Sequence, residues 1–182
     1  MSDISNTNIN YLSPIGYRMV FSRMPQIIYD LQSVALPSLS TGAVEVPTPF
    51  ASIPEGGDHI EYGAFPMNFM VDSQLINYDE IMAWMQALAP PTDYSQAVID
   101  INNPQKAIIG KGRKSDGILT ILTAENNASI YYYFRDLVPV GLSELIFDTR
   151  DEKITYITGS AKFIYSWFKR TTSLSQLSLL TP

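Results

Sequence analysis

The segment between Pro37 and Asp58 restricts the fold more than any other part of this 182-residue chain. It contains four prolines and three glycines: Pro37, Pro47, Pro49, Pro54, Gly42, Gly56 and Gly57. Proline lacks a backbone donor and glycine weakens regular structure, so this segment is excluded from a helix or a central strand. We expect a long proline-rich arm with little internal pairing, and one use of such an arm is to pack against a neighbour. The candidate subunit-contact residues of the arm are Val46, Pro47, Pro49, Phe50, Ile53 and Pro54.

Much of the remaining chain shows the alternating pattern of β-strands. Residues 16–23 place Tyr17, Met19 and Phe21 on one face, which predicts a half-buried strand. Residues 27–37 predict a second extended segment that ends at Pro37. Further on, four apolar residues share one face of an expected strand: Phe65, Met67, Phe69 and Val71.

One stretch changes to helical spacing. Its apolar residues recur at intervals of three or four: Ile81, Met82, Trp84, Met85 and Leu88. Asn77 followed by Glu80 is typical of a capping box, and Pro90-Pro91 would end the helix. We therefore expect one amphipathic helix of about three turns that packs on a sheet.

The C-terminal third predicts two hairpins. Residues 116–125 and 128–136 read as antiparallel strands joined by a turn at Asn126-Asn127. Residues 142–148 and 153–168 read as a second pair, joined by the charged turn 149–152, with a bulge at Gly159. Both faces of this last hairpin are apolar, so we expect the rest of the domain or neighbouring copies to cover it.

Composition indicates one globular domain that is stabilised by packing or assembly. Hydrophobic residues make up 46% of the chain and charged residues 16%, and no apolar run approaches the roughly 20 residues of a membrane helix. The N-terminus does not have the pattern of a secretory signal. With no cysteine, disulfides and thiolate metal sites are excluded, which fits a reducing compartment.

Charge is unevenly divided along the chain. Residues 1–100 carry a net charge of −9 and residues 101–182 a net charge of +3, which gives the total of −6. If each half forms its own surface, this division suits head-to-tail contact between copies. The alternative is that charges from both halves mix on the folded surface.

Signals for catalysis or metal binding are scarce, and we expect neither an enzyme nor a cofactor. His59 is the only histidine, and no nucleophile motif accompanies it, so it reads as a surface-loop residue. Asp148, Asp151 and Glu152 lack the spacing of a calcium loop and fit a solvated hairpin turn better.

The one basic, glycine-rich segment is residues 110–117. Such loops can hold phosphates, but here a strand follows in place of a helix. An exposed turn is the favoured interpretation, and a nucleic-acid contact through Lys111, Arg113 and Lys114 is the alternative. The sequence pI near 4.6 argues against a dedicated DNA-binding module.

Several short motifs between residues 15 and 169 follow one another in a set order. They are Leu36-Pro37 before the arm, Gly57-Asp58 at its end, Pro139, Ser143, Glu144, Leu145 and Asp148 farther along, and Tyr165 with Trp167 in the last strand. In this order they resemble the tail tube proteins of contractile-tailed bacteriophages. The resemblance implies an antiparallel β-sandwich or small barrel with one flanking helix, assembled into hexameric rings that stack into a hollow tube.

The resemblance also implies a division of the chain and a role. Residues 1–14 would be an extended leader, 15–170 the tail-tube-like domain and 171–182 a C-terminal tail. The leader, the tail and an insert around 90–115 depart from the shortest tube proteins and could mark a specialised ring at a tube end. Partners would be other copies and neighbouring tail, sheath or baseplate proteins in a virion assembled in the host cytoplasm, with no membrane partner.

Alternatives to a tube ring are a baseplate or capsid-decoration module and the ring protein of type VI secretion. A tube that passes DNA should not hold phosphates on its wall. We therefore expect acidic or neutral polar groups in the channel, and Lys111, Arg113 and Lys114 on the outer surface or at an interface.

Overall fold

The computed structural model describes residues 16–24, 27, 30–89, 113–123, 127–148 and 156–172. Within them the chain is mainly antiparallel β with one helix, as expected. In chain order the elements are β1 (Tyr17–Phe21), β2 (Leu31–Val34), β3 (Leu39–Pro47), β4 (Ser52–Tyr62), β5 (Phe65–Met70), α1 (Ile76–Leu88), β6 (Ser115–Leu122), β7 (Ala128–Leu142), β8 (Thr158–Ile164) and β9 (Trp167–Thr171).

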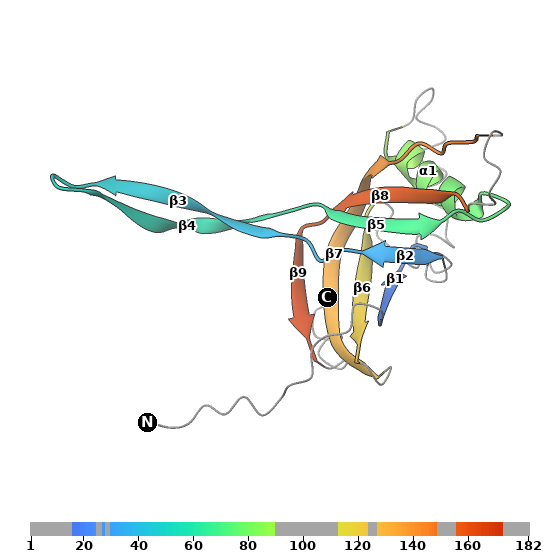
Figure 1. The fold of residues 1–182 in the computed structure, drawn as a ribbon, viewed down its shortest axis with the longest axis horizontal. Helices are drawn as coiled ribbons and strands as arrows, with labels where there is room; N and C mark the ends of the chain where they lie inside the picture. Colours follow the sequence, from blue (N-terminus) through green and yellow to red (C-terminus); the bar gives the residue numbers. More distant parts are fainter. Residues whose placement is uncertain are drawn as a thin grey trace.

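Two antiparallel layers form the body of the molecule, and the long strand β7 belongs to both (Figure 1). The first half of β7 pairs with β6 and β9, and β6 pairs with β1. The second half of β7 pairs with β8, followed by β5 and β2. No ladder joins β1 to β2 among the described strands, so the expected sandwich or small barrel is an open sandwich and not a closed barrel.

A polar corner bends β7 between the two layers. Asp136 has a φ of 59°, which is uncommon outside glycine, and its N–H donates to Asp116 Oδ1 at 3.0 Å. Opposite this bend, the Ser166 N–H donates to the Arg135 carbonyl at 2.9 Å and the Ser166 hydroxyl donates to Asp136 Oδ2 at 3.0 Å. The break between β8 and β9 therefore coincides with the bend of β7.

Aromatic and methionine side chains from both layers fill the core. Phe21 of β1 meets Phe163 of β8 with ring centroids 5.3 Å apart, and Phe65 of β5 meets Phe134 of β7 at 4.8 Å. The expected inward faces of β1 and β5 are confirmed, because these residues are almost fully buried: Met19, Phe21, Phe65, Met67 and Phe69. The extended segment expected over 27–37 is shorter than expected, and its regular part is β2.

The helix packs on the body through Ile81 and Trp84, as expected, but it begins differently. Leu75, in the left-handed conformation, precedes its first turn without a side-chain cap, so the expected capping box at Asn77 is wrong. Asn77 is 4% exposed and lies inside the first turn. Met82 is exposed, and the expected stop at Pro90-Pro91 lies outside the described residues.

The C-terminal region corrects a second expectation. β7 already ends at Leu142, so residues 143–148 do not form the expected strand, and the charged turn at 149–152 lies outside the described residues. Gly159 keeps regular register with Phe69 and is no bulge; a Cβ there would lie 2.9 Å from the Phe69 ring. β8 has one buried face and one exposed face, not two buried ones. The antiparallel pairing of β6 and β7 is confirmed, while Asn126 lies outside the described residues.

Candidate functional site

The proline-rich arm is a two-stranded hairpin that projects from the body (Figure 1). β3 and β4 pair only with each other among the described strands, from Leu39 opposite Tyr62 to Pro47 opposite Ser52. The expectation that this segment has little internal pairing is wrong. Its exclusion from the central strands of the body is confirmed.

The register explains how a strand ladder tolerates these prolines. A bond from the Thr48 N–H to the Ala51 carbonyl, 3.0 Å, closes the tip around Pro49 and Phe50. Hydrogen-bonded and non-hydrogen-bonded pairs alternate in an antiparallel ladder. Counted from the tip, Pro47 and Pro54 both fall in non-hydrogen-bonded pairs, so their missing N–H groups remove no bond between the strands.

The middle of the arm requires glycine. The register shifts between Thr41 and Ala43, where Gly42 faces Gly57. A Cβ on Gly57 would lie 2.6 Å from the Gly42 carbonyl oxygen, closer than real Cβ atoms approach. The strands can therefore cross this closely only without a side chain at Gly57.

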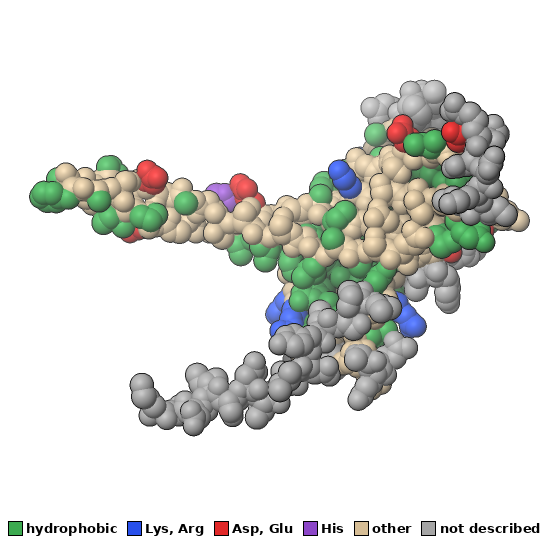
Figure 2. All heavy atoms as spheres, viewed as in Figure 1, with side chains coloured by type: hydrophobic (Ala, Val, Ile, Leu, Met, Phe, Trp, Pro, Cys, Tyr) green, Lys and Arg blue, Asp and Glu red, His purple; other side chains and the backbone are tan. Residues whose placement is uncertain are grey.

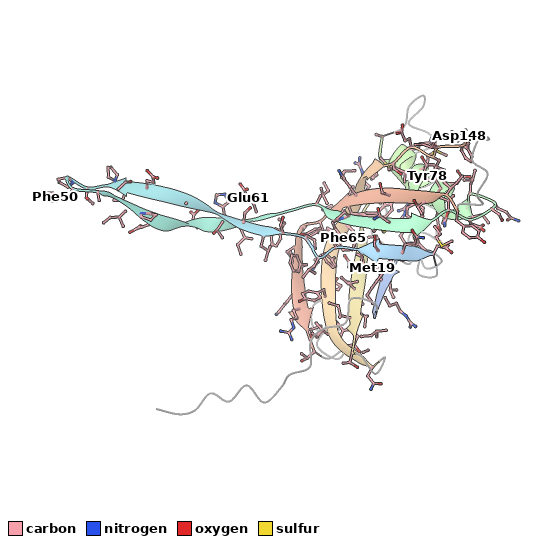
Figure 3. All side chains as sticks on the ribbon, in the orientation of Figure 1. Met19, Phe50, Glu61, Phe65, Tyr78 and Asp148 are labelled. Carbon is pink, nitrogen blue, oxygen red and sulfur yellow. The ribbon has the colours of Figure 1, made fainter. Side chains whose placement is uncertain are left out.

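Large apolar side chains are exposed on the distal half of the arm and again near its root (Figures 2 and 3). Phe50 at the tip is 99% exposed. The others on the arm are Leu39, Val44, Val46, Ile53, Ile60 and Tyr62. Apolar exposure on this scale is typical of an interaction surface, and an isolated two-stranded hairpin is at best marginally stable in water.

Aromatic rings fix the root of the arm to the body. The Tyr62 ring meets Tyr165 at 5.7 Å and Phe168 at 5.8 Å, and the Gly63 N–H donates to the Ser38 carbonyl at 2.9 Å. The Tyr165 hydroxyl is buried in this cluster without a hydrogen-bond partner. Burial, with a smaller contribution from Tyr62, raises the pKa of Tyr165 to about 12.

The arm is acidic as well as apolar. Residues 38–62 carry Glu45, Glu55, Asp58 and Glu61 and no lysine or arginine. His59 lies on the arm, mostly exposed, with Nδ1 3.0 Å from Asp58 Oδ1. This bond, followed by a backbone hydrogen bond, lowers the pKa of Asp58.

Two side chains of the candidate basic loop make polar contacts with other parts of the same chain. Arg113 Nη2 donates to the Leu88 carbonyl at the end of α1, 3.3 Å away, and Lys114 Nζ lies 3.7 Å from Asp136 Oδ2. Both side chains remain exposed, while Lys111 lies outside the described residues. Exposure in a single copy does not distinguish an outer surface from a channel wall, so the outer position of Arg113 and Lys114 stays a prediction.

The described residues offer no metal-binding cluster. They contain no group of three or more histidine and acidic side chains arranged to hold an ion. Asp148 is described, while Asp151 and Glu152 lie outside the described residues. In the same part of the chain, no helix is both long and apolar enough to cross a membrane.

The structure places all six predicted contact residues of the arm in its exposed distal half: Val46, Pro47, Pro49, Phe50, Ile53 and Pro54. Sequence reasoning missed Leu39, Val44, Ile60 and Tyr62, because the prolines and glycines obscured the strand pattern. The alternation of Val44 and Val46 around Glu45 was the available signal. It also missed three exposed apolar side chains on the body: Ile146, Phe147 and Tyr156.

Solved structures of contractile injection systems share this fold. A chain of the anti-feeding prophage cap, described as the tube-terminating cap, has a TM-score of 0.62 and 11% identity over 94% of this chain and 100% of that chain. A chain of the sheath–tube complex of the PVC extracellular contractile injection system has a TM-score of 0.61 and 10% identity over 95% and 100%. A chain of the anti-feeding prophage baseplate has a TM-score of 0.57 and 7% identity over 86% and 91%.

Comparisons by sequence find no relative: no family model matches the chain, and no curated protein does. The likeness to the solved structures therefore shows a shared fold. The resemblance expected from the sequence is confirmed for the fold, which is a contractile tail tube fold.

Proposed function

We propose that this protein is a non-catalytic structural subunit that forms or caps the stacked rings of a contractile tail tube. The observation that carries the proposal is the projecting arm with its exposed apolar side chains, which only contact with another molecule can cover. The fold shared with tube, cap and baseplate chains supports the same role.

At the finer level, we propose a phage tail whose tube passes DNA without binding it specifically. The partners are other copies and adjacent tail, sheath or baseplate proteins, and the location is a virion tail assembled in the host cytoplasm. The acidic arm and the engagement of Arg113 and Lys114 inside the chain support a tube that does not hold phosphates.

A second candidate role is the terminal cap of an injection system that is not a phage. The likeness to the tube-terminating cap over the whole of that chain favours it. A cap would form one ring without stacking, whereas a tube subunit would stack.

Electron microscopy of the purified full chain over a range of concentrations tests the proposal. Stacked rings are the expected result, single rings would indicate the cap, and a monomer at every concentration would contradict both. A structure of the assembled ring tests the channel: convergence of Lys111, Arg113 and Lys114 on the central axis would contradict passage of DNA without binding.

A further inference from the structure

The distal half of the arm presents one face with a specific composition. Val44 lies opposite Glu55, and Val46 lies opposite Ile53. Cross-strand partners share a face, and so do residues two apart along a strand. Three apolar side chains and one carboxylate therefore project together from the arm, and we call this set the distal face.

The body carries a small exposed surface of matching chemistry on β8 and β7. Lys162 and Ile164 alternate with buried Ala161 and Phe163, so they point outward from β8. Val140 lies in the register shift between Pro139 and Gly141, beside these positions. Ile164 is 50% exposed and Val140 49% exposed, and we call Val140, Lys162 and Ile164 the seat.

The charge at the seat is available for a partner. Lys162 is exposed, and no ion pair within the described chain engages it, in contrast to Lys114, which pairs with Asp136. Glu55 is likewise exposed on the arm. Two apolar side chains with one ammonium group on the body thus match three apolar side chains with one carboxylate on the arm.

The arm of the same molecule does not reach its own seat. The seat lies beside the root of the arm, because Phe65 follows β4 closely and pairs with Phe163 of β8. The arm runs outward from this root (Figure 1), so its distal face lies away from the seat. An arm that covers the seat must come from another copy.

We infer that the distal face of one copy, Val44, Val46, Ile53 and Glu55, docks on the seat of the next copy, Val140, Lys162 and Ile164. This inference rests on the proposed function and adds which surface receives the arm. The two surfaces differ, so the contact is head-to-tail: each copy donates one arm and accepts another. Such a contact closes a ring when its rotation returns to the first copy, as the proposed function requires.

Two variants, each defective in one surface, test this inference in the full chain. Val46→Asp places a charge on the distal face, and Ile164→Asp places one in the seat; both positions are exposed, so the monomer fold should persist. Each variant alone should need at least about a tenfold higher concentration to assemble. Mixed in equal amounts, they should give a 1:1 heterodimer and stop there, because only one intact contact remains.

Matched controls use exposed polar positions on the same elements. Thr41→Asp on the opposite face of the arm and Thr158→Asp at the other end of β8 should assemble like the wild type. The charge pairing has its own test: Glu55→Lys should weaken assembly, and addition of Lys162→Glu to the same chain should restore it. Size-exclusion chromatography with light scattering and native mass spectrometry measure all of these states.

The outcomes distinguish a failure of the proposed function from a failure of the docking between the distal face and the seat. A wild-type chain that stays monomeric contradicts the proposed function itself. Wild-type rings together with a mixture that yields no heterodimer, or an Ile164→Asp variant that assembles normally, overturn the seat alone. Circular dichroism of each variant confirms that a loss of assembly is not a loss of fold.

Discussion

Asn77 shows how one buried polar residue can join three parts of the chain. Its Nδ2 donates to the Met70 carbonyl at 2.7 Å and to Asp30 Oδ2 at 3.1 Å, and its Oδ1 accepts from the Asp72 N–H at 3.3 Å. The side chain thus ties the first turn of α1 to the end of β5 and to the loop before β2. The sequence pattern predicts Asn77 as a helix cap, but in the structure it hydrogen-bonds three separate parts of the chain to one another.

Replacement of Asn77 by alanine should lower the free energy of unfolding of the monomer by about 2–3 kcal/mol, since it leaves buried polar partners without bonds. Urea denaturation followed by circular dichroism measures this. Asn68→Ala is the control, because Asn68 is exposed and bonds Ser33 at 2.8 Å on the surface. An equal loss of unfolding free energy in the two variants would contradict this role of the Asn77 hydrogen bonds.

Tyr133, which is buried, and Tyr165, which is half-buried with a buried hydroxyl, should respond in opposite ways to removal of the hydroxyl. Tyr165→Phe removes a buried hydroxyl without a partner and should raise the free energy of unfolding by about 1 kcal/mol. Tyr133→Phe removes a 2.8 Å bond to Asp116 Oδ2 and should lower it by about 1 kcal/mol. The same sign for both variants at neutral pH would contradict the assigned bonding.

The same tyrosines predict a loss of stability at high pH. Burial raises the pKa of Tyr165 to about 12 and, together with the bond to Asp116, also raises the pKa of Tyr133. Tyrosine in an unfolded chain ionises near pH 10, so the unfolded state loses these protons first. The two protonated tyrosines therefore make their full contribution to the free energy of unfolding below about pH 10, and this contribution is lost as the pH rises toward 12. Across this pH range, the urea midpoint of Tyr165→Phe should fall less steeply than that of the wild type, because the variant lacks one of the two ionising groups.

At the scale of elements, the arm and the body are separate structures joined at one root. None of the fully buried core residues lies in β3 or β4. The ends of the arm already lie at hydrogen-bond distance, between Gly63 and Ser38. The body should therefore fold without the arm.

Replacement of residues 40–61 by Asn-Gly, which leaves Leu39 opposite Tyr62, supplies a two-residue hairpin turn. The shortened protein should keep a cooperative thermal transition and should not assemble at any concentration that assembles the wild type. Assembly of the shortened protein, seen by analytical ultracentrifugation, would contradict the role of the arm.

Hydrogen exchange should report the arm as the element that assembly stabilises. The ladder between β3 and β4 protects its amides only weakly in the monomer, because a two-stranded hairpin opens easily. Amides of β5 and β8 should exchange far more slowly. In the assembly the arm amides should slow as well, and unchanged exchange of the arm between the two states would refute this.

At the scale of the whole molecule, apolar contact favours assembly and net charge opposes it. Each copy carries −6, and each arm adds acidic groups near its neighbours. Salt screens this repulsion and leaves apolar burial intact. The concentration needed for half-assembly should therefore fall when NaCl rises from about 20 to about 300 mM, where the Debye length is shorter. A rise, measured by light scattering, would indicate an interface that is mainly ionic.

The sequence by itself determined the strands with a clean period of two, the existence of one helix and the presence of an arm. Met19, Phe21, Phe65 and Phe69 alternate with polar or smaller neighbours, and local alternation fixes which side of a strand faces the core. The concentration of proline and glycine excluded a central strand at 37–58 for an equally local reason.

Tertiary structure decided the features that depend on pairing between distant residues. Register placed Pro47 and Pro54 at positions without ladder bonds, which made the arm a hairpin. The bend at Asp136, held by Asp116 and Ser166, divided β7 between two layers and left one face of β8 exposed. Register and bends arise from contacts far apart in the chain, so no local pattern contains them, and the same holds for the seat that β7 and β8 form together.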